Sequence, residues 1–218
     1  MLKLVAVDRE AGKQEGEVDR VYRQLRNWIL QCEFRPGDFL SEVELARRCE
    51  TSRTPVREAC SRLAQEQWIT RIRHKGYMVP QISVREIVEI YEYRKLLESF
   101  TAERTAHTAT EEQISNLHKI IEAEKAARVS MAAILASNDR FHLGLAEIAR
   151  NQRVVEALTH TLEYVHRLDL LSAQRDFGWV PHGDILRAVE ARKPSQARKA
   201  MGAHIDIARD RMLRLFGG

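Results

Sequence analysis

Apolar side chains recur every three or four positions between residues 17 and 33, which is the spacing of one helix face. Pro36 and Gly37 follow in a stretch that favours a turn, so we expect the helix to end before them. Residues 1–16 carry no apolar run of signal-peptide length and are expected to form a flexible leader. The first element is therefore predicted to be one amphipathic helix.

Two short helices joined by a tight turn are expected next. Ser41 lies three residues before Glu44, the spacing of a capping box at the start of a helix over 41–49. Ser52 can cap a following helix over 52–65, and a proline is tolerated in the first turn of that helix. The apolar side of this second helix is narrow and consists of Val56, Ala59, Cys60 and Leu63. The pattern predicts a helix-turn-helix.

The period changes after Trp68. Apolar and polar residues alternate in WITRIR and in GYMVPQI, which flank HKG, and this predicts a β-hairpin. A helix, a helix-turn-helix and a hairpin, in this order, are typical of a winged helix over residues 17–80. From 83 to 215 the chain has few Gly and Pro residues, and an all-α antiparallel bundle is expected there. The fold class is thus mainly α, with bundle helices near 84–107, 111–129, 133–149, 152–175, 181–192 and 195–215.

The charge of the chain is concentrated in one region. The 218 residues are 44% hydrophobic and 30% charged, with a net charge of +4, as in an ordinary globular protein. Between residues 47 and 75, eight Lys and Arg residues face three Glu residues, so this stretch carries a local charge of +5. The three cysteines form no CxxC pair and no apolar run is long enough to span a membrane, which favours a reduced, cytoplasmic protein.

The basic stretch contains the expected recognition helix, whose first residues meet base edges in a helix-turn-helix. Arg53 and Arg57 lie one helical turn apart and can both face outward, where an arginine can pair with guanine. Ser52 and Thr54 suit phosphates at a helix N-terminus. The predicted DNA-binding set also includes Arg47 and, at the wing tip, His74 and Lys75. The alternative is a basic face that is only solvated.

A second set of chemically active residues lies in the predicted bundle. Asn138 and His142 are four apart on one helix face, and His182 and His204 each share a face with apolar residues. Three imidazoles that converge inside a bundle could bind a divalent ion. Three separately satisfied core histidines are the alternative, because the spacing across helices does not establish that they converge.

The N-terminal third resembles the signature of the GntR superfamily of bacterial transcriptional regulators. The resemblance rests on residues 35–63, RPGDFLSEVELARRCETSRTPVREACSRL, and on the later GYMV. It implies that Arg53 and Arg57 contact operator DNA and that a wing-tip residue near His74 enters the minor groove. Glu50 replaces a glycine that is usual at the turn, so local backbone strain is expected. Val43 stands where some relatives have a further DNA-contacting arginine.

Residues 83–215 resemble the FCD effector domain of the FadR branch, through YEYRKLLE, NDRFHLGLAEIARN and the pair PHGDIL and AMGAHI. The resemblance implies a divalent transition metal such as Zn or Ni, with Asn138, His142, His182 and His204 as ligands. Aspartate is more usual than asparagine at the first of these positions, and Asp139 could take its place. Arg94 matches a recurrent arginine that could clamp a carboxylate effector, unless it pairs with Glu98 within its own helix.

The combined patterns predict a homodimeric, ligand-responsive transcriptional regulator that binds palindromic operator DNA, with repression as the commoner action among relatives. One alternative is a metal-dependent enzyme that uses His142, His182 and His204, although no general base at a telling spacing and no GxSxG motif is present. A second alternative is an architectural DNA-binding protein whose bundle only dimerises.

Overall fold

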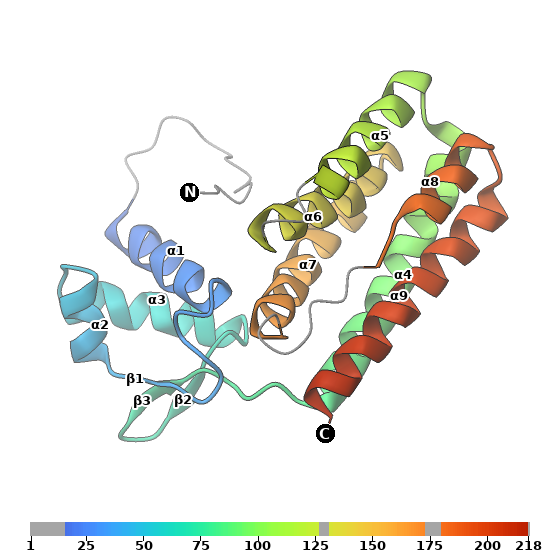
Figure 1. Cartoon of the computed structure of the whole chain (residues 1–218). Coiled ribbons are helices and arrows are strands. Elements are labelled where there is room, and N and C mark those ends of the chain that lie inside the picture. The colour runs from blue at the N-terminus through green and yellow to red at the C-terminus, as the bar shows by residue number, and fades with distance from the viewer. Residues whose placement is uncertain (1–15, 127–130, 173–179, 218) are drawn as a thin grey trace. The chain divides into compact units, whose positions relative to one another are not determined.

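A computed structural model describes residues 16–126, 131–172 and 180–217 of the chain. The chain divides into two compact units between Ile82 and Ser83 (Figure 1), and each unit is described by itself. Within the described ranges, no helix is both long and apolar enough to cross a membrane. The mainly α fold class, a winged helix-turn-helix followed by a helical bundle, is confirmed.

The first unit contains three helices and a small sheet. Its helices are α1 (Glu17–Leu30), α2 (Glu42–Arg48) and α3 (Arg53–Gln65), and its strands are β1 (Phe39–Leu40), β2 (Thr70–Ile72) and β3 (Gly76–Met78). The strands are antiparallel in the order β1-β3-β2, with Arg71 opposite Tyr77 and Leu40 opposite the same tyrosine. The hairpin β2–β3 was predicted. Strand β1 was not, because two residues are too few to show an alternating pattern.

The core of this unit joins its three helices with strands β1 and β3. The predicted apolar side of α3 is confirmed, since Val56, Ala59, Cys60 and Leu63 have no exposed surface. They pack with residues of α1, α2 and β3 in one cluster that includes Leu25, Ile29, Leu45 and Tyr77. Each apolar side chain of this size contributes roughly 1.5–3 kcal/mol when it is fully buried. Burial also raises the pKa of Cys60 to about 12, so this free thiol stays protonated.

The turn between α2 and α3 departs from the predicted caps. Ser41 accepts a hydrogen bond from the backbone N–H of Glu44 at 3.3 Å, which confirms the cap at the start of α2. The returning bond from the Glu44 side chain, which would complete the predicted capping box, is not among the contacts described for this turn. Ser52 occupies the N-cap position of α3, but its side chain makes no capping hydrogen bond, so the predicted cap was wrong in that respect. With ψ at 168°, its backbone is fully extended. Glu50 has φ of 53°, in the left-handed region that is unfavourable for a residue other than glycine, in line with the strain expected at this position.

The second unit is the helical bundle. Its helices are α4 (Val84–Thr108), α5 (Glu111–Ala126), α6 (Met131–Ile148), α7 (Gln152–Ser172), α8 (Gly183–Glu190) and α9 (Pro194–Phe216). Helix α4 begins with a full capping box between Ser83 and Glu86. It packs against α6, α7, α8 and α9, and Figure 1 shows α4 and α9 side by side along their length. The end of α9 returns to the start of α4, where Gly217 lies beside Val84.

Three predicted bundle helices have ends that differ from the prediction or that lie outside the described residues. The helix expected over 181–192 is shorter, because His182 is the N-cap of α8 and the helix ends at Glu190. The helices expected over 111–129 and 152–175 end in segments that lie partly outside the described residues. The remaining helices agree with their predicted ranges to within about two residues, which is the usual uncertainty of helix ends.

We expect Glu50→Gly to raise the free energy of unfolding of the winged helix by up to about 1 kcal/mol, because glycine adopts positive φ without a Cβ clash. Urea unfolding of the full chain in a Trp179→Phe background measures this, since the remaining tryptophans, Trp28 and Trp68, both lie in this unit. Glu58→Gly, in the interior of α3 and at negative φ, is the control and should lower the same free energy by about 1 kcal/mol. A fall for Glu50→Gly would contradict the proposed strain.

Candidate functional site

The exposed side of α3 presents the predicted DNA-binding residues. Ser52, Arg53, Thr54 and Arg57 are all exposed at the N-terminal end of this helix. The two arginine side chains retain 58% and 57% of their accessible surface, respectively. Arg47, in the last turn of α2, is exposed as well. The structure thus leaves these side chains on the surface, while the opposite side of α3 is buried.

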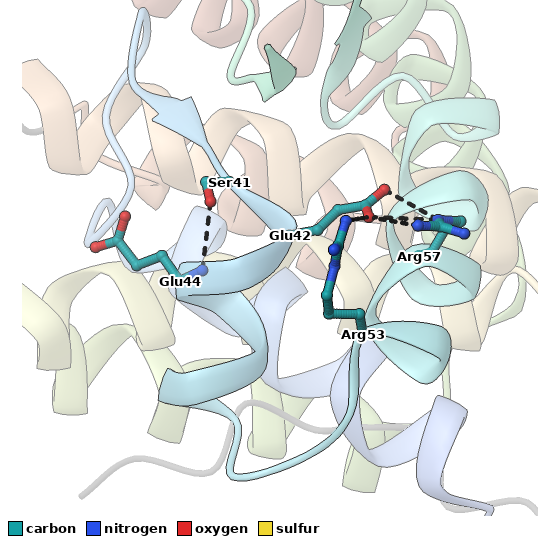
Figure 2. A network of polar contacts seen from close by, with 5 residues as sticks. All are labelled: Ser41, Glu42, Glu44, Arg53 and Arg57. Atoms are coloured by element: carbon teal, nitrogen blue, oxygen red, sulfur yellow. Dashed lines mark hydrogen bonds and ion pairs between the residues drawn. The ribbon is translucent and has the colours of Figure 1, made fainter. Parts of the chain in front are cut away.

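Glu42 joins the two arginines (Figure 2). The carboxylate lies in the first turn of α2 and accepts hydrogen bonds from Nε and Nη2 of Arg57, the latter at 2.9 Å. It also accepts one from Nη2 of Arg53 at 3.2 Å. The hydrogen bond from Arg57 lowers the pKa of Glu42, outweighing the opposing effect of burial, and Arg53 adds to the shift.

Glu42 was not predicted from the sequence to belong to this site. The carboxylate is 15 residues from Arg57 and 11 from Arg53, and it lies on a different helix. Only the packing of α2 on α3 brings the three side chains together. The only available signal was the acidic residue in the first turn of α2, and such residues are ordinary at helix N-termini.

The wing tip lies in the turn between β2 and β3. His74 and Lys75 are exposed there, and His74 has φ of 63° in the left-handed region. The Lys75 ammonium lies 5.7 Å from the centre of the Phe39 ring, which is itself 57% exposed. The hairpin therefore carries a cation and an imidazole at its end.

Three histidines meet inside the bundle. His142 of α6, His182 at the N-cap of α8 and His204 of α9 are all buried. Their ring centres lie 4.6–5.2 Å apart, and Nε2 of His142 is 3.2 Å from Nε2 of His182. One ring nitrogen from each residue lies within 4.8 Å of the others. The convergence that the sequence left open is present in the structure.

Two buried carboxylates contact the Nδ1 atoms of two of these rings, on the side away from the cluster. Glu98 of α4 contacts Nδ1 of His142, and Glu124 of α5 lies 3.0 Å from Nδ1 of His182. A carboxylate on Nδ1 favours a proton there and leaves the lone pair on Nε2, directed at the cluster. The sequence analysis named neither carboxylate as part of the site. Their contacts cross between helices, as those of Glu42 do.

Burial governs the protonation of two of the three histidines. Burial lowers the pKa of His182 against the opposing hydrogen bond to Glu124. It lowers the pKa of His204 further, helped by the two neighbouring histidines. At His182 and His204 the neutral imidazole is therefore favoured at neutral pH, and neutral imidazole is the form that binds metals. Nδ1 of His204 is buried and has no hydrogen-bond partner among the described residues.

These residues fit a divalent transition metal. Two nitrogens that are each about 2 Å from a common ion lie roughly 3 Å apart, as the two Nε2 atoms do. The two neighbouring carboxylates are the kind of outer partner that metal-binding histidines use. Asp139 is engaged elsewhere, since Oδ2 lies 3.3 Å from Nδ1 of His166. Asn138 donates a hydrogen bond to Asp139 and lines a cavity with His204.

Arg94 is buried beside the cluster. Its Nε donates to Oε1 of Glu98 at 2.7 Å, so the pair within one helix that the sequence analysis considered is present. Burial alone would raise the pKa of Glu98, but Arg94 and His142 together hold it below its ordinary value. Arg94 also lines a cavity of about 40 Å³ with Tyr91, Asn138, Asp169, His204 and Arg211.

Comparison with family models covers both units. The model of bacterial regulatory proteins of the gntR family matches residues 17–79, and the FCD domain model matches residues 89–207. The Nta operon transcriptional regulator of Aminobacter aminovorans is 28% identical over 85% of this chain and 89% of its own length. The HTH-type transcriptional repressor RspR of Escherichia coli is 29% identical over 85% of this chain and 84% of its own.

Solved structures agree with the fold. The Escherichia coli protein McbR/YncC covers 92% of this chain and 99% of its own with a TM-score of 0.74 at 18% identity. A putative transcriptional regulator GntR from Rhodococcus sp. RHA1 covers 90% and 97% with a TM-score of 0.73 at 21% identity. The relatives are transcriptional regulators and not enzymes, so the metal-dependent enzyme alternative has no support. The chain belongs to the gntR family of bacterial transcriptional regulators, in the group whose second domain is an FCD domain.

Proposed function

We propose that the protein is a homodimeric repressor that binds palindromic operator DNA through α3 and releases it in response to a small carboxylate. The exposed, arginine-bearing side of α3 carries this proposal. A recognition helix needs its first turns free of the protein core and rich in donors for base edges. Action on DNA places the protein in the cytoplasm.

The proposed DNA contacts are of two chemical kinds, those to base edges and those to phosphates. Arg53 and Arg57 would meet base edges, while Ser52, Thr54 and Arg47 would meet phosphates. His74 and Lys75 at the wing tip would reach a neighbouring groove. Because α3 begins at an extended residue with no side-chain cap, its first N–H groups remain available to a phosphate oxygen.

Dimer formation is supported by apolar side chains on the bundle. Tyr93 and Leu96 of α4 are 44% and 71% exposed, and Ile207 of the neighbouring α9 is 55% exposed. Large exposed apolar side chains on adjoining helices favour an interface. A two-fold axis would then present two recognition helices to a palindrome.

The histidine cluster would hold a divalent ion through His142, His182 and His204. A bound ion with an open coordination position would anchor and polarise a carboxylate. Glu98 and Glu124 keep two of the imidazoles in the tautomer that points a lone pair inward. Asn138 lies along the same cavity and would supply a neutral oxygen, a weaker ligand than the aspartate that is usual in relatives.

The effector would occupy the cavity beside the cluster. Arg94 and Arg211 line it, and a guanidinium suits a carboxylate. At about 40 Å³ the cavity has room for only a few water molecules, so a larger effector must displace side chains of α4, α6 and α9. Differential binding to two arrangements of these helices, typically 1–3 kcal/mol, would couple the effector to DNA affinity.

Arg57→Ala should weaken binding to a cognate duplex by about 1–3 kcal/mol, the usual scale of a bidentate base contact. Fluorescence anisotropy with a duplex carrying the promoter of the protein's own gene measures this. Arg85→Ala, an equal loss of charge on an 87% exposed side chain of α4, is the control and should leave the affinity unchanged. Equal affinities of the Arg57 variant and the unaltered protein would remove this arginine from the interface.

His182→Ala should abolish stoichiometric Zn²⁺ or Ni²⁺ binding, because it removes one nitrogen of the pair that is 3.2 Å apart. Elemental analysis after loading and dialysis counts the metal per chain. His160→Ala is the matched control, because this imidazole is 76% exposed and contacts only Glu163 among the partners that the structure gives it. Full metal occupancy in the His182 variant would show that the histidine is not a ligand.

A further inference from the structure

We infer that Glu42 sets the DNA specificity of this protein by holding Arg53 and Arg57 as one unit, so that they recognise bases instead of nearby phosphates. The inference rests on the proposed function of α3 as the recognition helix. It assigns a role to a carboxylate that would not touch the bases itself. Glu42 is thus a positioning residue.

The hydrogen bonds define which part of each arginine remains for DNA. Arg57 uses Nε and Nη2 toward Glu42, which occupies the side edge of the guanidinium. The end edge, formed by Nη1 and the second hydrogen of Nη2, keeps the two parallel donors that match O6 and N7 of guanine. Arg53 contacts the carboxylate through Nη2 alone. Figure 2 shows both guanidiniums converging on the one carboxylate.

The arrangement restricts side chains that are otherwise mobile. An exposed arginine loses rotamer entropy when it is fixed on a base, and the base contact must overcome this loss. Glu42 is the least exposed member of the group, with 15% of its side-chain surface accessible, so the packing around it limits its rotamers. Part of the ordering is therefore complete before DNA binds, and ordering in advance increases affinity for the matching partner.

The same carboxylate opposes binding to any DNA. A negative charge on the basic side of the helix-turn-helix repels phosphates, whose attraction supplies most non-specific affinity. Glu42 should therefore weaken binding to unrelated DNA and strengthen the preference for the correct sequence. Glu42 thus lowers the affinity for unrelated DNA and raises the ratio of specific to unrelated affinity. A residue that only stabilised the fold would raise both affinities, so the two explanations give different results.

Glu44 provides a matched control. It lies in the first turn of the same helix α2, carries the same charge and is exposed. Its backbone N–H bonds to Ser41, and in Figure 2 its carboxylate points away from the two arginines. Neutralising Glu44 reproduces the change in charge and in helix-terminus electrostatics, and it leaves the arginine pair intact.

The experiment first enriches a duplex from a random double-stranded library with the unaltered full-length protein. Affinities for the enriched duplex and for a scrambled duplex are then measured at one salt concentration for Glu42→Gln, Glu42→Asp and Glu44→Gln. Glu42→Gln should bind the scrambled duplex more tightly and lose about tenfold or more in the ratio of the two affinities. Glu42→Asp keeps the charge and moves it, so it should lose discrimination without a gain on scrambled DNA. Glu44→Gln should keep the ratio of the unaltered protein.

Several results would overturn the inference. A ratio for Glu42→Gln within twofold of the unaltered protein would show that Glu42 does not position the arginines, even if both affinities rise. A loss of both affinities together with a lower melting temperature in both Glu42 variants would show a structural role only. If the unaltered protein enriches no sequence at all, the proposed function fails and the inference fails with it.

Discussion

Glu98 is a carboxylate with no exposed surface in the middle of the helical bundle. The desolvation of such a charge costs several kcal/mol, which only close charged partners offset. Arg94, one turn earlier on α4, engages one oxygen, and His142 of α6 engages the other. One side chain therefore links α4 to α6 and orients the first imidazole of the cluster. The second imidazole, that of His182, is oriented by the other buried carboxylate, Glu124.

Glu42 performs a related task under the opposite conditions. It also bridges two basic groups, but both of its arginines are more than half exposed. Ion pairs in contact with water contribute little to stability, so the bridge at Glu42 can orient the two arginines without being needed for the fold. The contacts of Glu98 differ in this respect, because a buried partner left alone is strongly destabilising. One carboxylate thus orients side chains on a surface, and the other belongs to the core.

The sequence predicted the helices and strands better than the side-chain contacts between them. Helical periodicity identified the buried side of α3, and with it the exposure of Arg53 and Arg57, because that pattern is local. Placing histidines on apolar faces likewise suggested an interior position. Local signals fail where the partner lies on another helix. Glu124 is 58 residues from His182, and this spacing does not predict that the two side chains are in contact.

Two smaller failures have the same physical origin. Strand β1 exists because its two residues pair with β3, so its conformation is decided by a distant segment. Ser52 has the residue type of a cap, yet the extended path of the chain out of the tight turn leaves its hydroxyl without a capping bond.

The capping box at Ser83 has a mechanical consequence. It starts α4 at the first residue after the division between the two units, and α4 then continues without a break for 25 residues. Arg94 and Glu98 lie on this helix, the former about 15 Å from its first residue, Val84, at 1.5 Å per residue. A change in the tilt of α4 that an effector forces at these two side chains would therefore also move the N-terminal end of the helix, which directly follows the boundary between the two units.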